Sequence, residues 1–119
     1  MGDRANVEFF NEEGERLFFY THHEGSRLPW VVKRALERGK TRWDDSSYLA
    51  RIIFCELIRN DVDGLTGFGI DTRAAGDAQW PAIQVNMRGQ SVTIGAKIWS
   101  FEDFIEVSDD EIERAYQET

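Results

Sequence analysis

Residues 83–98 read IQVNMRGQSVTIGAKI, and this stretch decides the fold class. Apolar and polar residues alternate over residues 83–87 and again over residues 92–98, which is the two-residue period of a half-buried β-strand. The residues between these runs, RGQ at 88–90, favour a tight turn. The stretch therefore predicts a β-hairpin with one face against a hydrophobic core.

Three further strands are expected outside this hairpin. Residues 5–11 and 15–21 are rich in Phe and Tyr, and EEG at 12–14 joins them as a second hairpin. Both runs carry apolar residues on both faces, so we expect at least one of these strands to be covered on two sides. In residues 66–70, TGFGI, apolar residues alternate with glycine, which predicts a strand that a helix or a ligand can approach closely.

Two helices are expected between the second and third strands. Ser26 is the expected N-cap of the first helix, Pro29 suits its first turn and Gly39 ends it. The apolar residues of this helix share one face, but Trp30 falls on the polar face among charged side chains. The packing of this helix alone does not explain a tryptophan in that position.

The second helix is expected to begin at Asp44 or Asp45, whose carboxylates can cap the free amides, and to run to about Asn60. Its apolar residues cover nearly the whole helical wheel, which is typical of a helix buried on most sides. We therefore expect it to be the central helix, with Cys55 as part of its packing rather than as a reactive thiol.

Short helices are expected near the C-terminus, because Ser100 with Asp103, and Ser108 with Glu111, have the spacing of a capping box. The predicted order of elements is β-β-α-α-β-β-β-α. This order favours an α+β fold, with an antiparallel sheet of about five strands and helices mainly on one face.

The chain has 119 residues, which suits a single domain over residues 1–119 with an acidic helical segment at about 100–119. Apolar residues make up 41% and charged residues 30%, a balance that excludes a disordered or fibrous protein. No apolar run approaches about 18 residues and no secretory signal opens the chain, so neither a membrane span nor export is expected. One cysteine fits the reducing cytoplasm, which is the predicted location.

The formal net charge of −8 is unevenly distributed along the chain. Residues 102–119 hold eight acids and one arginine, whereas residues 27–42 hold six bases and one glutamate. An overall basic surface for nucleic acid is therefore excluded. Nucleic-acid binding by residues 27–42 alone is the least favoured function.

The acidic residues of the C-terminal segment allow two interpretations. Either they and the basic segment at 27–42 solvate two faces of the fold and pair across it, or they form an acidic surface for a basic protein partner. A second candidate contact patch combines an aromatic residue with basic ones, as interface anchors do. The acidic surface consists of Asp103, Glu106, Asp109, Asp110, Glu111 and Glu113, and the second patch of Trp30, Lys33 and Arg34.

Two junctions before the expected helices collect chemically versatile side chains. The first could bind an anion at a helix N-terminus, and His22 or His23 could move a proton near neutral pH. In the second, Arg42 could bind a carboxylate or phosphate beside the flat ring of Trp43. The alternative is a structural role, and the short connection favours antiparallel helices, which would place the junctions at opposite ends. The candidate ligand residues are Tyr20, His22, His23, Ser26, Arg27, Arg42, Trp43 and Asp44.

No motif for a metal, a cofactor or catalysis is complete. Residues 61–64, DVDG, look like the start of a calcium loop, but Thr72 stands where the closing glutamate belongs. Gly67 and Gly69 lack the third glycine of a dinucleotide fingerprint. The histidines and the one cysteine do not have the spacing of zinc ligands. We therefore expect no metal and no cofactor, and we favour a non-enzymatic protein.

Several short motifs support a resemblance to a group of known proteins. They are YTH at 20–22, GS at 25–26 with LP at 28–29, RWDD at 42–45, YL at 48–49, RIIF at 51–54 and TGFGI at 66–70. In these motifs, over roughly residues 17–105, the chain resembles small uncharacterised proteins encoded by bacteriophages and prophages. The resemblance implies an accessory protein that binds a host or viral protein, as inhibitors of bacterial defence systems do. It carries over no functional residue.

The leading hypothesis is a small acidic accessory protein of phage type that acts as a non-enzymatic protein-binding module and inhibits a host or defence protein. The alternative is a small-ligand binder for phosphate or carboxylate, or a small hydrolase-like enzyme, centred on His22, Arg27 and Arg42. A homodimer is a further hypothesis, since Trp30 and Trp80 could lie on its surface.

Overall fold

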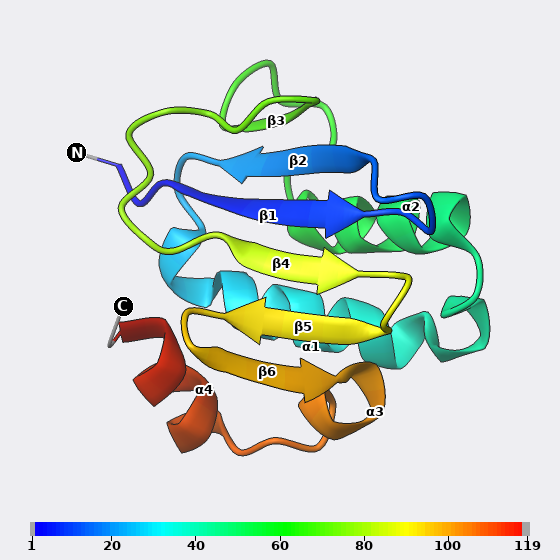
Figure 1. Ribbon diagram of the computed structural model, residues 1–119. Coiled ribbons are helices and arrows are strands. Elements are labelled where there is room, and N and C mark those ends of the chain that lie inside the picture. Colours follow the sequence, from blue (N-terminus) through cyan, green and yellow to red (C-terminus); the bar gives the residue numbers. More distant parts are fainter. Residues whose placement is uncertain (1, 118–119) are drawn as a thin grey trace.

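The computed structural model describes residues 2–117 and shows an α+β fold, as predicted. The strands are β1 (Ala5–Phe10), β2 (Arg16–Thr21), β3 (Phe68–Asp71), β4 (Ile83–Asn86), β5 (Ser91–Ile94) and β6 (Lys97–Ser100). The helices are α1 (Leu28–Arg38), α2 (Ser46–Leu57), α3 (Phe101–Phe104) and α4 (Asp109–Gln117), with short 3-10 turns at Gly25–Arg27 and Lys40–Arg42. All six strands form one sheet in the order β3-β2-β1-β4-β5-β6 (Figure 1).

The sheet has six strands rather than about five because the expected strand at 92–98 is broken in two. Gly95 has a φ of 59°, in the left-handed region that favours glycine, and the chain turns there between β5 and β6. The two strands therefore form a further antiparallel hairpin, in which Ile94 lies opposite Lys97.

The sheet is mixed, so the expectation of an antiparallel sheet is wrong at one pair of strands. β1 and β4 are parallel, with Phe9 opposite Val85, while the other neighbouring strands are antiparallel. After β2 the chain passes through α1 and α2 and forms β3 at the free edge of β2. It then returns to the other side of β1 as β4, so β3 and β4 are consecutive in sequence but not adjacent in the sheet.

The two long helices, α1 and α2, lie on one face of the sheet and run antiparallel to each other (Figure 1). The hydrophobic core fills the space between these helices and the sheet. The expected cover on two sides is found at β1, where Asn6 and Glu8 on the opposite face are also buried. Asn6 exchanges two hydrogen bonds with Ala75, and Glu8 accepts one from Gln84 at 3.1 Å and pairs with Arg16 at 2.9 Å.

The start of α1 differs from the prediction. Ser26 does not cap the helix, because it lies in the preceding 3-10 turn and its N–H donates to Oδ2 of Asp3 at 2.9 Å. Pro29 lies in the first turn and Gly39 follows the last residue, as predicted. The carboxylate that accepts a hydrogen bond at this end of α1 therefore belongs to Asp3 in the N-terminal segment, and not to a residue of the helix.

The second helix begins as predicted, but it is not the central one. Asp45 caps α2 and accepts a hydrogen bond from the N–H of Tyr48 at 3.3 Å. Cys55 is exposed rather than packed, and Tyr48 is 49% exposed, because α2 covers one side of the helix layer and nothing in the described chain covers its outer face. The helix ends at Leu57 instead of about Asn60.

The C-terminal segment is built into the fold. Ile112 and Tyr116 of α4 are buried, and the phenolic hydroxyl of Tyr116 donates to the carbonyl of Gly25 at 2.8 Å. The ring of Trp80 stacks on Tyr116 with 4.5 Å between the centroids, and burial raises the pKa of the Tyr116 phenol. Within residues 2–117, no helix combines the length and the apolar character needed to cross a bilayer.

Candidate functional site

A pocket of about 250 Å³ lies between the N-terminal half of α1 and the C-terminal end of α2. Three arginine side chains line it, together with an indole, an imidazole and a phenyl ring from β3. We call it the arginine pocket, and the residues that define it are His23, Arg27, Trp30, Arg34, Arg59 and Phe68.

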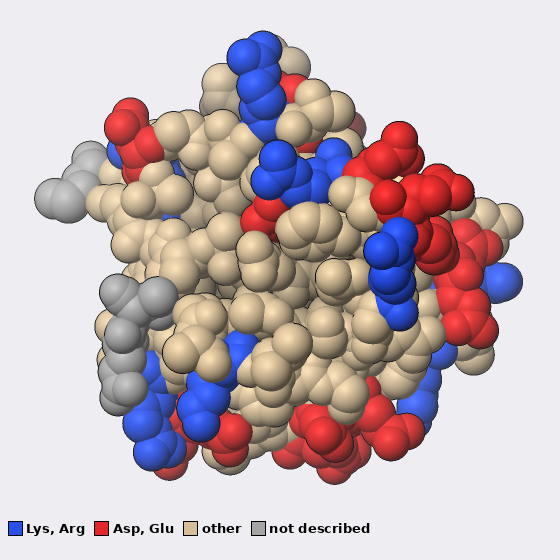
Figure 2. Space-filling view, viewed as in Figure 1, with Lys and Arg blue, Asp and Glu red and all other residues tan. Residues whose placement is uncertain are grey.

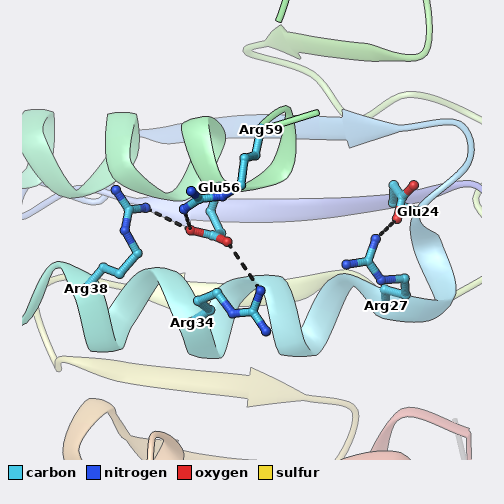
Figure 3. A network of polar contacts seen from close by, with 6 residues as sticks. All are labelled: Glu24, Arg27, Arg34, Arg38, Glu56 and Arg59. Carbon is cyan, nitrogen blue, oxygen red and sulfur yellow. Dashed lines mark hydrogen bonds and ion pairs between the residues drawn. The ribbon is translucent and has the colours of Figure 1, made fainter. Parts of the chain in front are cut away.

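Helix periodicity and antiparallel packing bring these residues together. Arg27, Trp30 and Arg34 are spaced by three and four residues, so they share one face at the start of α1. Because α2 runs in the opposite direction, its last turn with Glu56 lies beside that face, and Arg59 follows just beyond it (Figure 3).

A buried carboxylate holds the arginines of the two helices together. The side chain of Glu56 is only 4% exposed, and its Oε1 accepts hydrogen bonds from Arg59 at 2.6 Å and Arg38 at 2.8 Å (Figure 3). Arg34 lies 3.9 Å from the other carboxylate oxygen. Burial alone would raise the pKa of Glu56, but the arginines outweigh it and hold that pKa below its usual value. Glu56 is therefore an ionised counter-ion in a buried position.

The arginine pocket is lined by three arginines and by three carboxylates, those of Glu24, Glu56 and Asp61. Three arginines share the one carboxylate of Glu56, and Arg27 pairs with Glu24 on the other side of the pocket. Arg34 has the longest contact with Glu56 and a side chain that is 64% exposed, so its guanidinium has donors free for another anion. This arrangement suits a carboxylate or a phosphate.

Trp30 links the arginine pocket to the C-terminal segment. Its Nε1 donates to Oδ1 of Asp109 at 2.9 Å, and Nζ of Lys33 donates to the carbonyl of Val107 at 2.8 Å. The start of α4 therefore covers the polar side of α1, which explains the tryptophan in that position. The patch of Trp30, Lys33 and Arg34 touches the acidic surface and does not stand apart from it.

Most of the acidic surface faces solvent. Glu111 is the exception, since it is half-buried and accepts a hydrogen bond from Nε1 of Trp99 at 3.2 Å. None of the six acids forms an ion pair with another residue of the described chain, 2–117. The exposed members are Asp103, Glu106, Asp109, Asp110 and Glu113.

The two histidines of the first junction have different surroundings. His23 lines the arginine pocket, whereas Nδ1 of His22 accepts hydrogen bonds from Nε of Arg4 at 3.2 Å and from the hydroxyl of Tyr20 at 3.0 Å. Partial burial lowers the pKa of His22, and the positive charge of Arg4 lowers it further. His22 is therefore neutral, with its proton on Nε2, and it belongs to a separate polar cluster.

The anion expected at the start of α1 is supplied by the protein itself. The carboxylate of Asp3 accepts hydrogen bonds from the N–H of Ser26 at 2.9 Å and from Nε1 of Trp80 at 2.6 Å. Burial would raise the pKa of Asp3, but these hydrogen bonds outweigh it and lower the pKa. The helix N-terminus is thus occupied, and the candidate residues of this junction that line the arginine pocket are His23 and Arg27.

The second junction lies at the opposite end of α1 from the arginine pocket, so the two junctions do not form one site (Figure 1). The guanidinium of Arg42 lies over the ring of Tyr48, 4.8 Å from its centroid. Nε1 of Trp43 donates to a carbonyl of α1 at 3.0 Å, and Asp44 accepts a hydrogen bond from Gln90 at 3.0 Å. These contacts tie the helix connection to its neighbours.

Sequence reasoning missed Glu56 and Arg59, which complete the arginine pocket. The available signal was the position of Glu56, a charged residue within the apolar run of α2. A buried carboxylate needs cationic partners. Those partners, Arg34 and Arg38, are spaced by one helical turn on α1, but only the packing of the two helices shows that they meet Glu56.

The face of the sheet opposite the helices offers no comparable concentration of charge. In Figure 2 most charged side chains lie around the rim of this face, and its centre is largely uncharged. Nor does the described part of the chain contain a group of three or more His, Cys, Asp or Glu placed to hold a metal ion.

Comparison of this chain with protein-family models, with curated proteins and with solved structures gave no match. The argument for function therefore depends on the geometry and the chemistry of the protein's own residues.

Proposed function

We propose that the protein is a non-enzymatic binding module that recognises a carboxylate or phosphate group in the arginine pocket. The observation that carries the proposal is the convergence of Arg27, Arg34 and Arg59 on one hollow. Within residues 2–117, these arginines form ion pairs with Glu24 and Glu56, and the third carboxylate of the lining, Asp61, forms none. A guanidinium donates two parallel hydrogen bonds to a carboxylate or a phosphate, so arginine suits this recognition better than other side chains do.

The size and walls of the pocket define what fits. Its volume of about 250 Å³ is below the roughly 300–1,000 Å³ typical of sites for drug-sized ligands. It therefore suits one anionic group with a small attachment. Trp30 adds a flat apolar wall whose orientation is fixed by the hydrogen bond to Asp109.

The lining favours binding over catalysis. Hydrolysis in the pocket would need a nucleophile, or a water held beside a base. The lining residues within the described chain include no Ser, Thr or Cys, and two of their three carboxylates, Glu24 and Glu56, are paired with arginines. The arginines supply recognition and no proton transfer.

A thermal-shift screen with orthophosphate, pyrophosphate and citrate tests this proposal. A ligand at about ten times its Kd stabilises the folded state by about 1.4 kcal/mol, so the Tm of the wild type rises by several degrees. Arg34→Gln removes most of that rise. The matched control Arg51→Gln, on the exposed side of α2 and outside the pocket, keeps it. No rise with any of the three anions, or an equal rise in Arg34→Gln, contradicts the proposal.

The acidic surface supports a second candidate function, the docking of a basic protein partner. Its carboxylates reach solvent without ion pairs inside residues 2–117, while Ile112 and Tyr116 anchor α4 to the core. Together with the net charge of −8, these carboxylates would speed association with a basic surface. The resemblance to phage proteins suggests a host or defence protein as that partner.

A pull-down from a bacterial lysate distinguishes the two candidates. A stoichiometric partner that is lost with the double variant Asp110→Lys/Glu113→Lys but kept by Arg34→Gln supports docking on the acidic surface. A partner that is lost with Arg34→Gln but kept by the double variant binds at the arginine pocket, because the acidic surface then contributes no specific contact.

A further inference from the structure

The outer edge of β3 presents main-chain groups without partners. The N–H of His22 donates to the carbonyl of Gly67 at 2.8 Å, so these two residues form a hydrogen-bonded pair between β2 and β3. In an antiparallel ladder, such pairs alternate with pairs whose main-chain groups point away from the neighbouring strand. The N–H and C=O groups of Phe68 and Ile70 therefore point away from β2, toward the free edge of the sheet (Figure 1). Neither residue's main chain has a hydrogen-bond partner on that side within residues 2–117.

β3 is a short edge strand of four residues that ends with Asp71, and its other three residues carry no charge. Natural edge strands are often guarded by lysine, by proline or by a covering segment. Residues 62–70 contain no lysine, arginine or proline, and they include three exposed apolar side chains. These are Val62, Leu65 and Ile70, with exposures of 67%, 98% and 52%. The other edge strand, β6, begins instead with Lys97.

The free edge of β3 is continuous with the arginine pocket. Phe68, the first residue of β3, lines the pocket, and so does Asp61 in the segment that leads into the strand. An extended chain that pairs with Phe68 and Ile70 therefore passes beside the guanidinium groups.

We propose that β3 receives an extended segment of a partner protein as an additional strand, and that an acidic or phosphorylated side chain of this segment occupies the arginine pocket. This inference rests on the proposed function of the pocket. Unpaired main-chain donors and acceptors select an extended backbone, the exposed apolar residues select apolar side chains, and the arginines select the anionic group. A second copy of this chain is the competing occupant, and the oligomeric state of the free protein distinguishes it from a partner segment.

Selection from a random dodecapeptide display library on the immobilised wild-type protein tests the inference. The enriched peptides contain Asp or Glu at a fixed position next to alternating apolar residues. Their affinity falls at least tenfold in Ile70→Pro, which removes one outward N–H and leaves the pairing with β2 intact. It also falls at least tenfold in Arg34→Gln.

The matched control is Ile98→Pro, at the other edge of the sheet. Phe101 donates to the carbonyl of Gln90 at 2.7 Å, so the same alternation turns the N–H of Ile98 outward from β6. This variant therefore also loses one edge donor, but it binds the enriched peptides like the wild type. Peptides whose affinity is equal in the Ile70→Pro and Ile98→Pro variants overturn the inference.

A measurement on the unmodified protein covers the case in which Ile70→Pro does not fold. The amide hydrogens of Phe68 and Ile70 exchange fast in the free protein and at least tenfold more slowly with an enriched peptide bound. Unchanged exchange at both amides in the peptide complex overturns the inference. So does a dimer of the free protein that Ile70→Pro dissociates, since the edge would then belong to a second copy.

Failure of this inference and failure of the proposed function have different signatures. If pyrophosphate stabilises the wild type and not Arg34→Gln, but the library yields no binder, the pocket binds anions and the strand-addition inference is overturned. If neither pyrophosphate nor any peptide binds, both are overturned.

Discussion

Glu56, with a side chain only 4% exposed, pairs with Arg34 and Arg59 of the arginine pocket and with Arg38 outside it, whereas most acidic side chains of α3 and α4 extend into solvent without ion pairs in the described chain. The two regions touch, since Trp30 and Lys33 contact Asp109 and the carbonyl of Val107. Their difference lies in preorganisation. The buried Glu56 fixes the arginines in one arrangement before any ligand arrives, while solvated carboxylates remain mobile and are screened by salt.

The largest expected effect is on stability, and it separates the two regions directly. Glu56→Ala removes the hydrogen bonds of a buried carboxylate to half-exposed arginines and lowers the free energy of unfolding by about 2 kcal/mol. Glu113→Ala, on the acidic surface, changes it by less than about 0.5 kcal/mol. Urea denaturation at pH 7 measures both. Equal effects would show that the buried carboxylate is no different from a solvated one.

The next effect concerns ligand affinity. Arg34→Gln weakens pyrophosphate binding about tenfold, which corresponds to about 1.4 kcal/mol. The double variant Asp110→Lys/Glu113→Lys changes it less than about twofold at physiological salt, because neither residue lines the pocket and salt screens exposed charges. Isothermal titration calorimetry gives both values. A stronger effect of the double variant would locate anion recognition near α4.

The contact between the two regions has a smaller but measurable energy. In a double-mutant cycle with Trp30→Phe and Asp109→Asn, we expect a coupling free energy of about 1 kcal/mol. Either single substitution removes the same hydrogen bond between the indole and the charged carboxylate, so the second substitution does not remove it again. Denaturation of the four proteins measures this coupling. A coupling of zero would mean that the start of α4 does not orient the indole of Trp30.

The smallest expected effect is the pH dependence of stability. Burial would raise the pKa of Glu56, but its arginines lower that pKa overall, so the native state holds the proton less tightly than the unfolded state. The stabilisation is present above the unfolded pKa of about 4.5 and is lost as the pH falls through the lower native value. Wild type therefore loses stability more steeply than Glu56→Gln below about pH 4.5, and parallel acid titrations of the two would argue against an ionised Glu56.

Much of the fold follows from local patterns in the sequence. Alternation at 83–87, the Phe-rich runs before 21 and the caps at Asp45 and Gly39 all predict elements that the structure contains. Two features depend on tertiary structure. The parallel pairing of β1 with β4 depends on the path of the whole chain after β2, and the break at Gly95 is hidden in a run whose alternation continues through the turn.

The candidate site was only partly visible in the sequence. Trp30 on a polar helix face was the correct signal of a missing neighbour, and Arg27 and Arg34 were singled out in separate groups. Arg27 and Arg34 come close to Glu56 and Arg59 only because of the way in which α1 and α2 cross. That crossing is fixed by packing between residues about twenty positions apart, which periodicity does not encode.

The most direct test of the central claim is the location of an anion on the protein. Titration of pyrophosphate into the ¹⁵N-labelled protein, followed by NMR, reports on the backbone amides, the arginine Nε–H groups and the tryptophan indole N–H groups. We predict saturable shifts at Trp30, Arg34 and Arg59, with none at Arg42 or Trp43 at the opposite end of α1. Shifts at the second junction instead, or no saturable shift at all, would contradict anion recognition by the arginine pocket.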